Sequence, residues 1–270
     1  MTDSPVSSPV LVFDSGLGGL SVAAEIRQRR PDLPLRYLAD NAAFPYGLKA
    51  DAFLKQRVID VISAAVDRER PRLVVLACNT ASTIALNELR EALELPVVGT
   101  VPGIKPAAEQ SRSGVIGVLA TPRTAQSGYI DALVRDHGAG RHFIVQPAEG
   151  LAREAEAVLA GAAPDLDLLR GLQHAIRQAP RGEEVDTLVL GCTHYPLLQA
   201  ELEATAPHAW SYLDTGSAIA RRVDDLLPER GQAAAGDSAL LTAGVEAEAG
   251  YARALARFGF ALAEPLHRLA

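Results

Sequence analysis

Short apolar runs that end in a small or polar residue recur along the chain, and most are followed by a stretch with helical periodicity. The runs are residues 10–13, 35–39, 73–77, 96–98, 115–119, 141–145, 185–190 and 211–213. The longest helical stretch, residues 51–70, has an apolar face made of Phe53, Leu54, Val58, Val61, Ile62 and Ala65. This alternation is typical of parallel sheets covered by helices, so the sequence predicts an α/β fold.

The only two cysteines of the 270 residues follow two of these runs. Cys78 comes directly after residues 73–77, and Cys192 follows residues 185–190 and Gly191. The two cysteines lack the close spacing of a zinc site or a redox pair. In an α/β protein, ligands bind at the carboxyl ends of the strands, where the following helices begin. We therefore expect the two thiols to face one substrate.

The two halves of the chain have similar sequence features at corresponding positions. Asp14-Ser15 in the first half corresponds to Ala120-Thr121 in the second, as Cys78 corresponds to Cys192. We therefore predict two similar lobes, each a mostly parallel sheet flanked by helices, with the active site in the cleft between them. Glycines and prolines cluster at residues 99–106, so we expect the chain to cross from one lobe to the other there.

Composition excludes several classes of partner. The chain has 26 basic and 33 acidic residues, a net charge of −7, and no dense cluster of Lys or Arg, which disfavours a nucleic-acid partner. No apolar stretch approaches the ~20 residues that span a bilayer. Residues 1–9 lack the pattern of a signal peptide. We expect a cytoplasmic protein with no membrane association, whose thiols stay reduced.

Two facing thiols suit one type of chemistry. Inverting a carbon that bears an acidic C–H requires a base on one face and an acid on the other. A free thiol has a pKa of ~8.5, so a thiolate needs help from its surroundings. We expect a helix N-terminus beside each cysteine, His194 beside Cys192, and Asp14 beside Cys78 to provide it. The neighbours Asn79-Thr80 and Thr193-His194 can bind carboxylates and an ammonium group.

Four motifs, in order along the chain, resemble the glutamate racemase family of the aspartate/glutamate racemase superfamily. They are Phe-Asp-Ser-Gly-Leu-Gly-Gly at residues 13–19, Pro-Tyr-Gly at 45–47, Ala-Cys-Asn-Thr at 77–80 and Gly-Cys-Thr-His-Tyr-Pro at 191–196. The resemblance implies cofactor-independent interconversion of L- and D-glutamate, which supplies D-glutamate for peptidoglycan. It also implies that Cys78 acts on the D enantiomer and Cys192 on the L enantiomer.

The resemblance further implies that the C-terminal part returns to the first lobe, so that the first lobe comprises residues 1–98 and 210–270 and the second residues 99–209. It also implies the residues of the site. The expected catalytic residues are Cys78, Cys192, Asp14, His194 and, as a helper carboxylate of the second lobe, Glu154. The expected substrate contacts are Asp14, Ser15, Pro45, Tyr46, Gly47, Asn79, Thr80, Thr121, Thr124, Thr193 and His194. No metal and no cofactor are expected, and the partner is the small-molecule substrate glutamate. Assembly as a homodimer is left open.

Other functions stay open at this point. The glycines at residues 16–19 do not fit a dinucleotide or P-loop spacing. The side chain of the substrate is set by pocket shape, so aspartate or another acidic amino acid is an alternative substrate. A nucleophilic cysteine enzyme that uses Cys192 and His194 is another alternative, and it predicts that Cys78 is dispensable. A ligand-binding protein without catalysis is a third.

Overall fold

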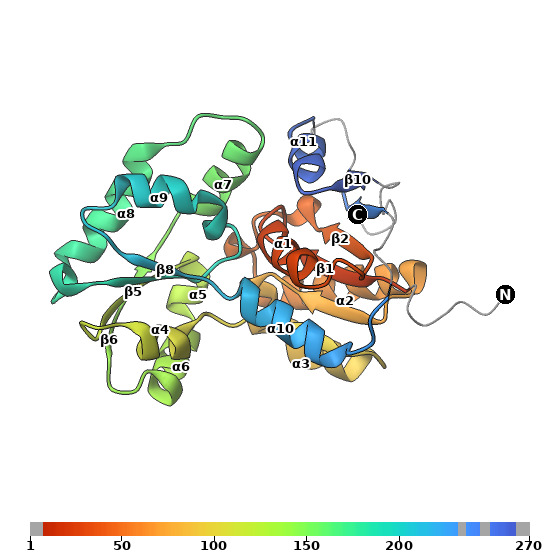
Figure 1. Ribbon diagram of the computed structural model, residues 1–270, viewed down its shortest axis with the longest axis horizontal. Helices are drawn as coiled ribbons and strands as arrows, with labels where there is room; N and C mark the ends of the chain where they lie inside the picture. The colour runs from red at the N-terminus through yellow and green to blue at the C-terminus, as the bar shows by residue number, and fades with distance from the viewer. Residues whose placement is uncertain (1–7, 232–235, 244–248, 263–270) are drawn as a thin grey trace.

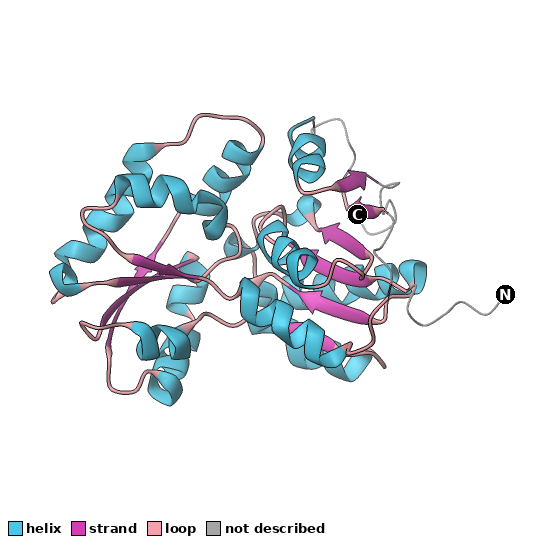
Figure 2. Cartoon of the chain, viewed as in Figure 1, coloured by secondary structure: helices cyan, strands magenta, loops and turns pink. Residues whose placement is uncertain are grey.

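The structure is a computed structural model that describes residues 8–231, 236–243 and 249–262. It contains two parallel sheets, each covered by helices on both faces (Figures 1 and 2). The six-stranded sheet has the order β10-β9-β2-β1-β3-β4. Its strands are β1 (Val10–Asp14), β2 (Leu35–Ala39), β3 (Leu73–Leu76), β4 (Val97–Gly99), β9 (Asp237–Leu241) and β10 (Phe260–Leu262). The predicted α/β class is confirmed.

The four-stranded sheet repeats the central order of the first sheet. Its order is β6-β5-β7-β8, with β5 (Val115–Ala120), β6 (His142–Pro147), β7 (Thr187–Leu190) and β8 (Ser211–Leu213). The first four strands of each half of the chain therefore lie in the same spatial order: second, first, third and fourth. This order is β2-β1-β3-β4 in the first sheet and β6-β5-β7-β8 in the second. Cys78 follows the third strand of one sheet and Cys192 the third strand of the other. The echo between the two halves of the sequence reflects this shared topology.

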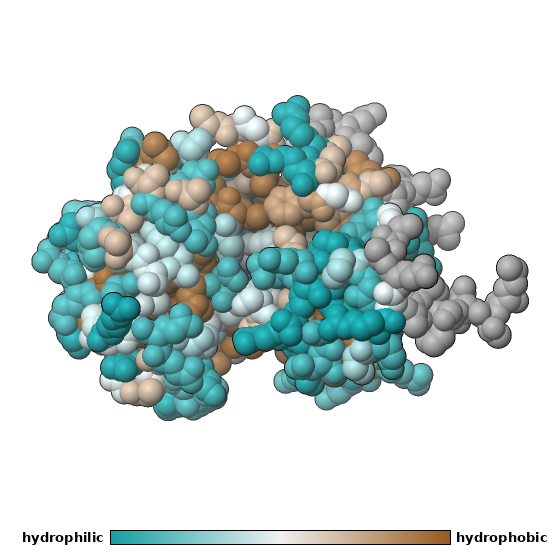
Figure 3. Space-filling view, in the orientation of Figure 1, coloured by the Kyte–Doolittle hydropathy of each residue, from teal (hydrophilic) through white to brown (hydrophobic). Residues whose placement is uncertain are grey.

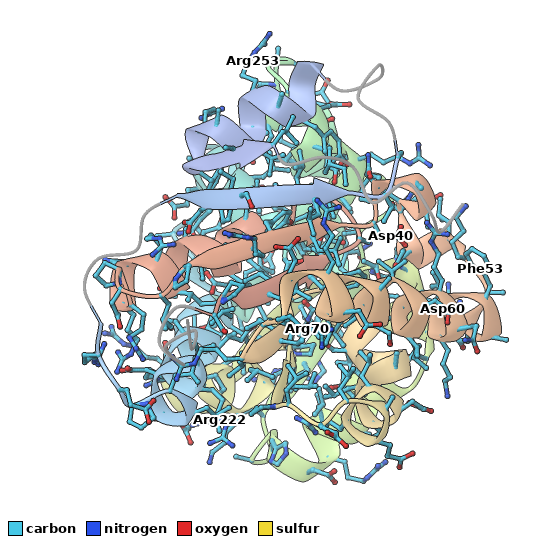
Figure 4. The ribbon with its side chains drawn as sticks, turned by 90° about the vertical axis from the view of Figure 1, so that its right-hand side faces the viewer. Asp40, Phe53, Asp60, Arg70, Arg222 and Arg253 are labelled. Atoms are coloured by element: carbon cyan, nitrogen blue, oxygen red, sulfur yellow. The ribbon has the colours of Figure 1, made fainter. Side chains whose placement is uncertain are left out.

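Helices cover both faces of the first sheet because their apolar stripes pack against its buried strands. One face carries α1 (Leu20–Arg29), α10 (Gly216–Leu226) and α11 (Ala249–Arg257), and the other carries α2 (Asp51–Glu69) and α3 (Asn79–Ala92). Most of the predicted apolar face of α2 is buried. Phe53 is the exception, since it is half exposed and points away from the sheet (Figure 4).

The second sheet is covered in the same way. One face carries α7 (Leu151–Leu159), α8 (Leu166–Gln178), the 3-10 helix η4 (Tyr195–Leu198) and α9 (Gln199–Thr205). The opposite face carries α4 (Ile104–Gln110) and α6 (Tyr129–His137), with the short α5 (Pro122–Gln126) preceding α6. Short 3-10 helices also occur at Asn41–Ala43, Tyr46–Leu48 and Gly182–Glu184.

The lobe boundary predicted at residue 210 needs a correction. Residues 211–213 were assigned to the first lobe, but Ser211 pairs with Thr187, which makes β8 the edge strand of the second sheet. The chain returns to the first lobe only with α10, which packs beside α1. We therefore propose that the second lobe ends after Leu213.

Smaller differences have local causes. Glycines and prolines at residues 99–106 favour a connecting segment, but α4 begins within it, with Pro106 in its first turn. The helical pattern that runs to about residue 136 is divided into α5 and α6, since Gly128 between them has a φ of +71°. Strand β10 was missed. The predicted helix over 245–258 begins outside the described residues, and α11 accounts for its described part. No helix in the described ranges is both long enough and apolar enough to cross a membrane.

Candidate active site

The carboxyl ends of the central strands of both sheets meet, and they bring the two cysteines together. Cys78 follows β3 and Cys192 follows β7; both thiols are free, and their residues are 5% and 7% exposed. They are close enough that charge on Cys192 raises the pKa of Cys78. The spatial pairing predicted from their matching sequence contexts is therefore present. Figure 3 shows apolar surface gathered where the two lobes meet.

Cys78 has the surroundings of a proton donor. It is the N-cap residue of α3, and its Sγ donates to Ser15 Oγ at 3.8 Å. Burial is the main cause that raises the pKa of the Cys78 thiol, and the negative charge of Asp14 raises it further. The backbone N–H of Ala81 and the Ser15 hydroxyl lower it by less. The net effect keeps Cys78 as a thiol.

Cys192 has a different neighbour. Its Sγ lies 3.7 Å from Nδ1 of His194. The predicted helix N-terminus beside this cysteine is absent, because the chain after Cys192 forms a turn and then the four-residue 3-10 helix η4. Cys192 therefore has the titratable imidazole of His194 beside it, whereas Cys78 has the N-terminus of a long helix.

His194 is almost fully buried between acidic groups. Its Nε2 lies 3.0 Å from Glu156 Oε1 and 3.9 Å from Asp14 Oδ2. Burial alone would lower the pKa of His194, but the contacts with Cys192 and Glu156 and the charge of Asp14 raise it well above its ordinary value. The ring of Phe44 packs against the imidazole, with centroids 5.3 Å apart. An imidazolium at this position stabilises a thiolate on Cys192.

The structure places Glu156 beside His194, and not Glu154, the residue predicted as the helper carboxylate. Glu154 lies on a more exposed part of α7, where its Oε1 accepts a hydrogen bond from the backbone N–H of Asp165 at 2.6 Å. Glu156 is buried, and its Oε1 accepts from the backbone N–H of Leu17 at 2.7 Å in addition to contacting His194. Its other oxygen accepts from the hydroxyl of Tyr251. The two residues differ because only Glu156 lies on the buried side of the helix.

The glycine-rich turn after β1 is shaped by side chains of the second lobe. A Cβ at Gly16 would lie 1.9 Å from Glu156 Oε1, and a Cβ at Gly18 would lie 2.3 Å from His194 Nδ1. The N–H of Gly18 also approaches His194 Nε2 to 3.2 Å. That nitrogen cannot accept this bond while it donates to Glu156, and we assign it as the donor because a carboxylate faces it at the shorter distance. Glycine is thus required here for close approach.

Asp14 links the two halves of the site. Its Oδ2 accepts from the backbone N–H of Gly16 at 2.9 Å, and its Oδ1 accepts from the hydroxyl of Thr193 at 3.1 Å. Burial raises the pKa of Asp14, and His194 and these two hydrogen bonds offset part of that effect. One carboxylate therefore contacts the residue after Cys192 and places its charge near Cys78.

The loop with Pro45, Tyr46 and Gly47 forms one wall of the site. The hydroxyl of Tyr46 donates to Asp40 Oδ2 at 2.6 Å, so this phenol holds the loop in place. Gly47 lies against Thr121 of the other lobe. Asp40 is fully buried and also accepts from two nitrogens of Arg57, at 2.6 and 2.7 Å. The loop is thereby fixed to β2 and α2.

A cavity of about 200 Å³ opens between this loop and the second lobe. Three of the predicted substrate contacts line it: Pro45, Gly47 and Thr121. Thr124 lies next to Thr121, with their hydroxyl oxygens 2.9 Å apart. Asn79 and Thr80 are buried in the first turn of α3, directly after Cys78. Within the described parts of the chain, no group of three or more His, Cys, Asp or Glu side chains could hold a metal ion.

Comparison with known proteins agrees with this arrangement. Residues 20–223 match the Asp/Glu/Hydantoin racemase family. The glutamate racemase of Sphingopyxis alaskensis is 46% identical over 219 residues, which cover 81% of this chain and 82% of the relative. That of Pectobacterium atrosepticum is 47% identical over 219 residues, covering 81% and 76%.

The chain belongs to the glutamate racemase family.

A solved member of the family has nearly the same fold. The glutamate racemase of Escherichia coli superimposes with a TM-score of 0.88 at 40% identity, covering 95% of this chain and 97% of the other. Isoform RacE1 of Bacillus anthracis gives a TM-score of 0.79 at 26% identity, covering 96% and 97%. The chain is accordingly an isomerase of this family, with the two-lobe α/β architecture that its sequence predicts.

Three residues that contact the candidate site in the structure were not predicted from the sequence. Glu156 follows Ala152 by four positions and precedes Leu159 by three, so a charge on the apolar stripe of α7 was a signal for it. Phe44 and Tyr251 gave no such signal, because nothing in a loop sequence or a distant C-terminal helix indicates contact with the second lobe.

Proposed function

We propose that this protein interconverts L- and D-glutamate without a cofactor, using Cys78 and Cys192 as acid–base groups on opposite faces of the α-carbon. The observation that carries this proposal is the placement of both free thiols after equivalent strands, β3 and β7, close enough that charge on Cys192 raises the pKa of Cys78. The E. coli relative was solved in complex with L-glutamate and the activator UDP-MurNAc-ala, which supports glutamate as the substrate.

The reaction on L-glutamate starts at Cys192. Its thiolate, paired with the imidazolium of His194, takes the α-proton, and the electron pair stays on the α-carbon, delocalised into the carboxylate. The thiol of Cys78 then gives its proton to the opposite face. Cys192 ends as a thiol and Cys78 as a thiolate, which is the arrangement that acts on D-glutamate.

The pKa shifts of Cys78 and His194 support this direction of transfer. The raised pKa of Cys78 keeps a proton available on the acid. The raised pKa of His194 provides a cation beside the base. In the reverse direction Cys78 must lose its proton, and the carboxylate of Asp14 is the nearby acceptor whose own pKa is raised by burial. Asn79, Thr80, Thr193 and the 45–47 loop are proposed to bind the substrate's carboxylates and ammonium group.

The biological part of the proposal follows from the product. D-glutamate is needed for peptidoglycan, and we propose that the enzyme supplies it. We place the reaction in the cytoplasm, where two unpaired cysteines remain reduced.

The decisive experiment incubates the protein with single enantiomers of glutamate and of aspartate in D2O, without added cofactor. We expect deuterium at the α-carbon and appearance of the opposite enantiomer with glutamate. Exchange with aspartate alone would move the proposal to that substrate. No exchange with either amino acid would refute it.

Cysteine variants separate the proposal from a nucleophilic cysteine enzyme. Cys78→Ser and Cys192→Ser are each expected to abolish steady-state racemisation, because each removes one of two required groups. The Cys192–His194 contact alone would also suit a nucleophile. That alternative predicts that Cys78→Ala keeps its turnover and that a covalent adduct forms on Cys192, which intact-protein mass spectrometry would detect.

A further inference from the structure

A tyrosine of the C-terminal helix reaches the carboxylate beside the candidate active site. Tyr251 lies on α11, and its hydroxyl donates to Oε2 of Glu156 on α7. Helix α11 belongs to the first lobe, because Ala254 and Leu255 pack in the core of the six-stranded sheet. Helix α7 belongs to the second lobe, and the two helices lie side by side (Figure 1). The contact therefore crosses between lobes.

Glu156 divides its two oxygens between different partners. Oε1 takes the backbone N–H of Leu17 at 2.7 Å and the ring of His194 at 3.0 Å, while Oε2 takes Tyr251. His194 in turn contacts the thiol of Cys192 at 3.7 Å. Four side chains thus form one line from α11 to the thiol.

We propose that Tyr251 is a positioning residue for racemisation, which holds Oε2 of Glu156 so that Oε1 stays against His194 and the Cys192–His194 pair keeps its geometry. This inference rests on the proposed function for its catalytic consequence. A buried carboxylate needs partners for both oxygens. If Oε2 loses the phenol, the carboxylate of Glu156, which is 9% exposed, must turn or be left partly unpaired. Either outcome weakens its hold on His194.

The orienting role can be separated from simple docking of α11. Arg253, on the same helix, donates through Nη1 to the backbone oxygen of Ala160 at 3.2 Å, and its side chain extends from the outer end of α11 (Figure 4). This second contact also joins α11 to the second lobe, but it does not touch Glu156. Removing it tests docking alone.

Among the described residues, the following titratable groups face the line from Tyr251 to Cys192. His194 faces Cys192, Glu156 from α7 and Asp14 from β1. Burial raises the pKa of Tyr37, on β2, well above the ordinary value, and the charges of Asp14 and Glu156 raise it further. Tyr37 therefore stays neutral. If loss of the Tyr251 hydroxyl changes the ionisation of Cys192, we therefore attribute that change to the contacts of Glu156 and His194.

The test compares Tyr251→Phe with two controls, Arg253→Met and Tyr212→Phe. Tyr212→Phe is the matched change, because it removes a phenol that donates to the backbone oxygen of Leu202 at 3.0 Å in the second lobe. Three quantities are measured in each protein: kcat/KM for glutamate, the primary isotope effect with each α-deuterated enantiomer, and the pH dependence of Cys192 alkylation by iodoacetamide, with Cys78 as internal reference.

We expect Tyr251→Phe to lower kcat/KM by about 10-fold, the usual effect of one hydrogen bond to a charged group. The isotope effect should rise more with L- than with D-glutamate, because Cys192 removes the proton of the L enantiomer. Alkylation of Cys192 should shift to higher pH by about one unit, while that of Cys78 stays unchanged. Neither control should move these readouts.

Three results would overturn the inference. Wild-type kcat/KM and an unchanged alkylation profile in Tyr251→Phe would show that the phenol positions nothing. The same losses in Arg253→Met would show that docking of α11 is what matters. A shift caused by Tyr251→Phe that persists in a Glu156→Gln background would show that it does not act through Glu156. Failure of the wild-type protein to racemise glutamate would refute the proposed function, yet the alkylation shift would still test Tyr251.

Discussion

The contact between the glycine-rich turn and His194 gives the sharpest test of the site, through Gly18→Ala. The added Cβ would lie 2.3, 2.6 and 2.7 Å from three atoms of the imidazole. Ordinary contacts start near 3.4 Å, so the ring must retreat by about 1 Å. His194 has no free space for this movement, because it is 2% exposed and packs against Phe44.

This movement of His194 would break one of its hydrogen bonds, which determines the expected loss of rate and of stability. A shift of about 1 Å takes His194 out of hydrogen-bond range of Glu156, now 3.0 Å away, or of Cys192. Misplacing a catalytic group by this amount costs about 100-fold in rate. Overpacking of a buried contact costs about 1–3 kcal/mol of folding free energy, which corresponds to a fall in Tm of about 2–4 °C per kcal/mol for a chain of this size.

The assay is racemisation of L- and D-glutamate followed by polarimetry, together with thermal unfolding. Gly171→Ala is the matched control, because a Cβ there meets nothing within 4 Å and the residue lies inside α8. We expect that variant to keep its kcat/KM and to gain about 0.5–1 kcal/mol of stability from helix propensity. If Gly18→Ala instead retained wild-type kcat/KM and Tm, the close packing of this turn on His194 would not be needed for function, and our account of the turn would be wrong.

Two further predictions concern the acidic and titratable groups. Glu156→Gln should lower kcat/KM by about 100-fold, because His194 loses its anionic partner, whereas Glu154→Gln should stay within twofold of wild type; equal effects in steady-state kinetics would contradict the assignment of Glu156. The pKa of His194 is higher in the folded protein than its ordinary 6.5, so the resulting stabilisation is full below pH 6.5 and is lost as the pH rises through the folded-state pKa. Denaturant titrations from pH 6.5 to 8.5 should therefore show the wild type losing more unfolding free energy than His194→Gln, and parallel curves would argue against a raised pKa.

The sequence predicted the fold class, and the convergence of several candidate site residues, because both depend on local patterns. Apolar runs and helical periodicity define parallel α/β units, and parallel strands place their carboxyl ends at one edge. Asp14, Cys78 and Cys192 follow three such strands, so their convergence required only the topology. The motifs of the family resemblance extended this to the 45–47 loop and to Thr121.

What the sequence did not reveal depends on long-range contacts. Glu154 and Glu156 are both acidic residues of one helix, and only the rotation of α7 against the first lobe decides which of them meets His194. Residues 211–213 are too short a run to indicate which sheet they join. In the turn at residues 16–19, the N–H of Leu17 donates to an anion, and this anion is the Glu156 carboxylate of the same chain, far away in sequence.

The shared strand order of the two sheets has a consequence for how the site responds to its surroundings. The same position after the third strand holds a cysteine in both lobes, but the chain then continues differently. Cys78 caps α3, a helix whose aligned peptide dipoles carry the same partial charge at every pH. Cys192 is followed by His194, whose side chain is charged only when it is protonated. The helix charge beside Cys78 is constant, and the Asp14 carboxylate acts on the same thiol, whereas the charge beside Cys192 depends on the protonation of His194. The acidity of the medium therefore acts on the two faces of the substrate through different groups.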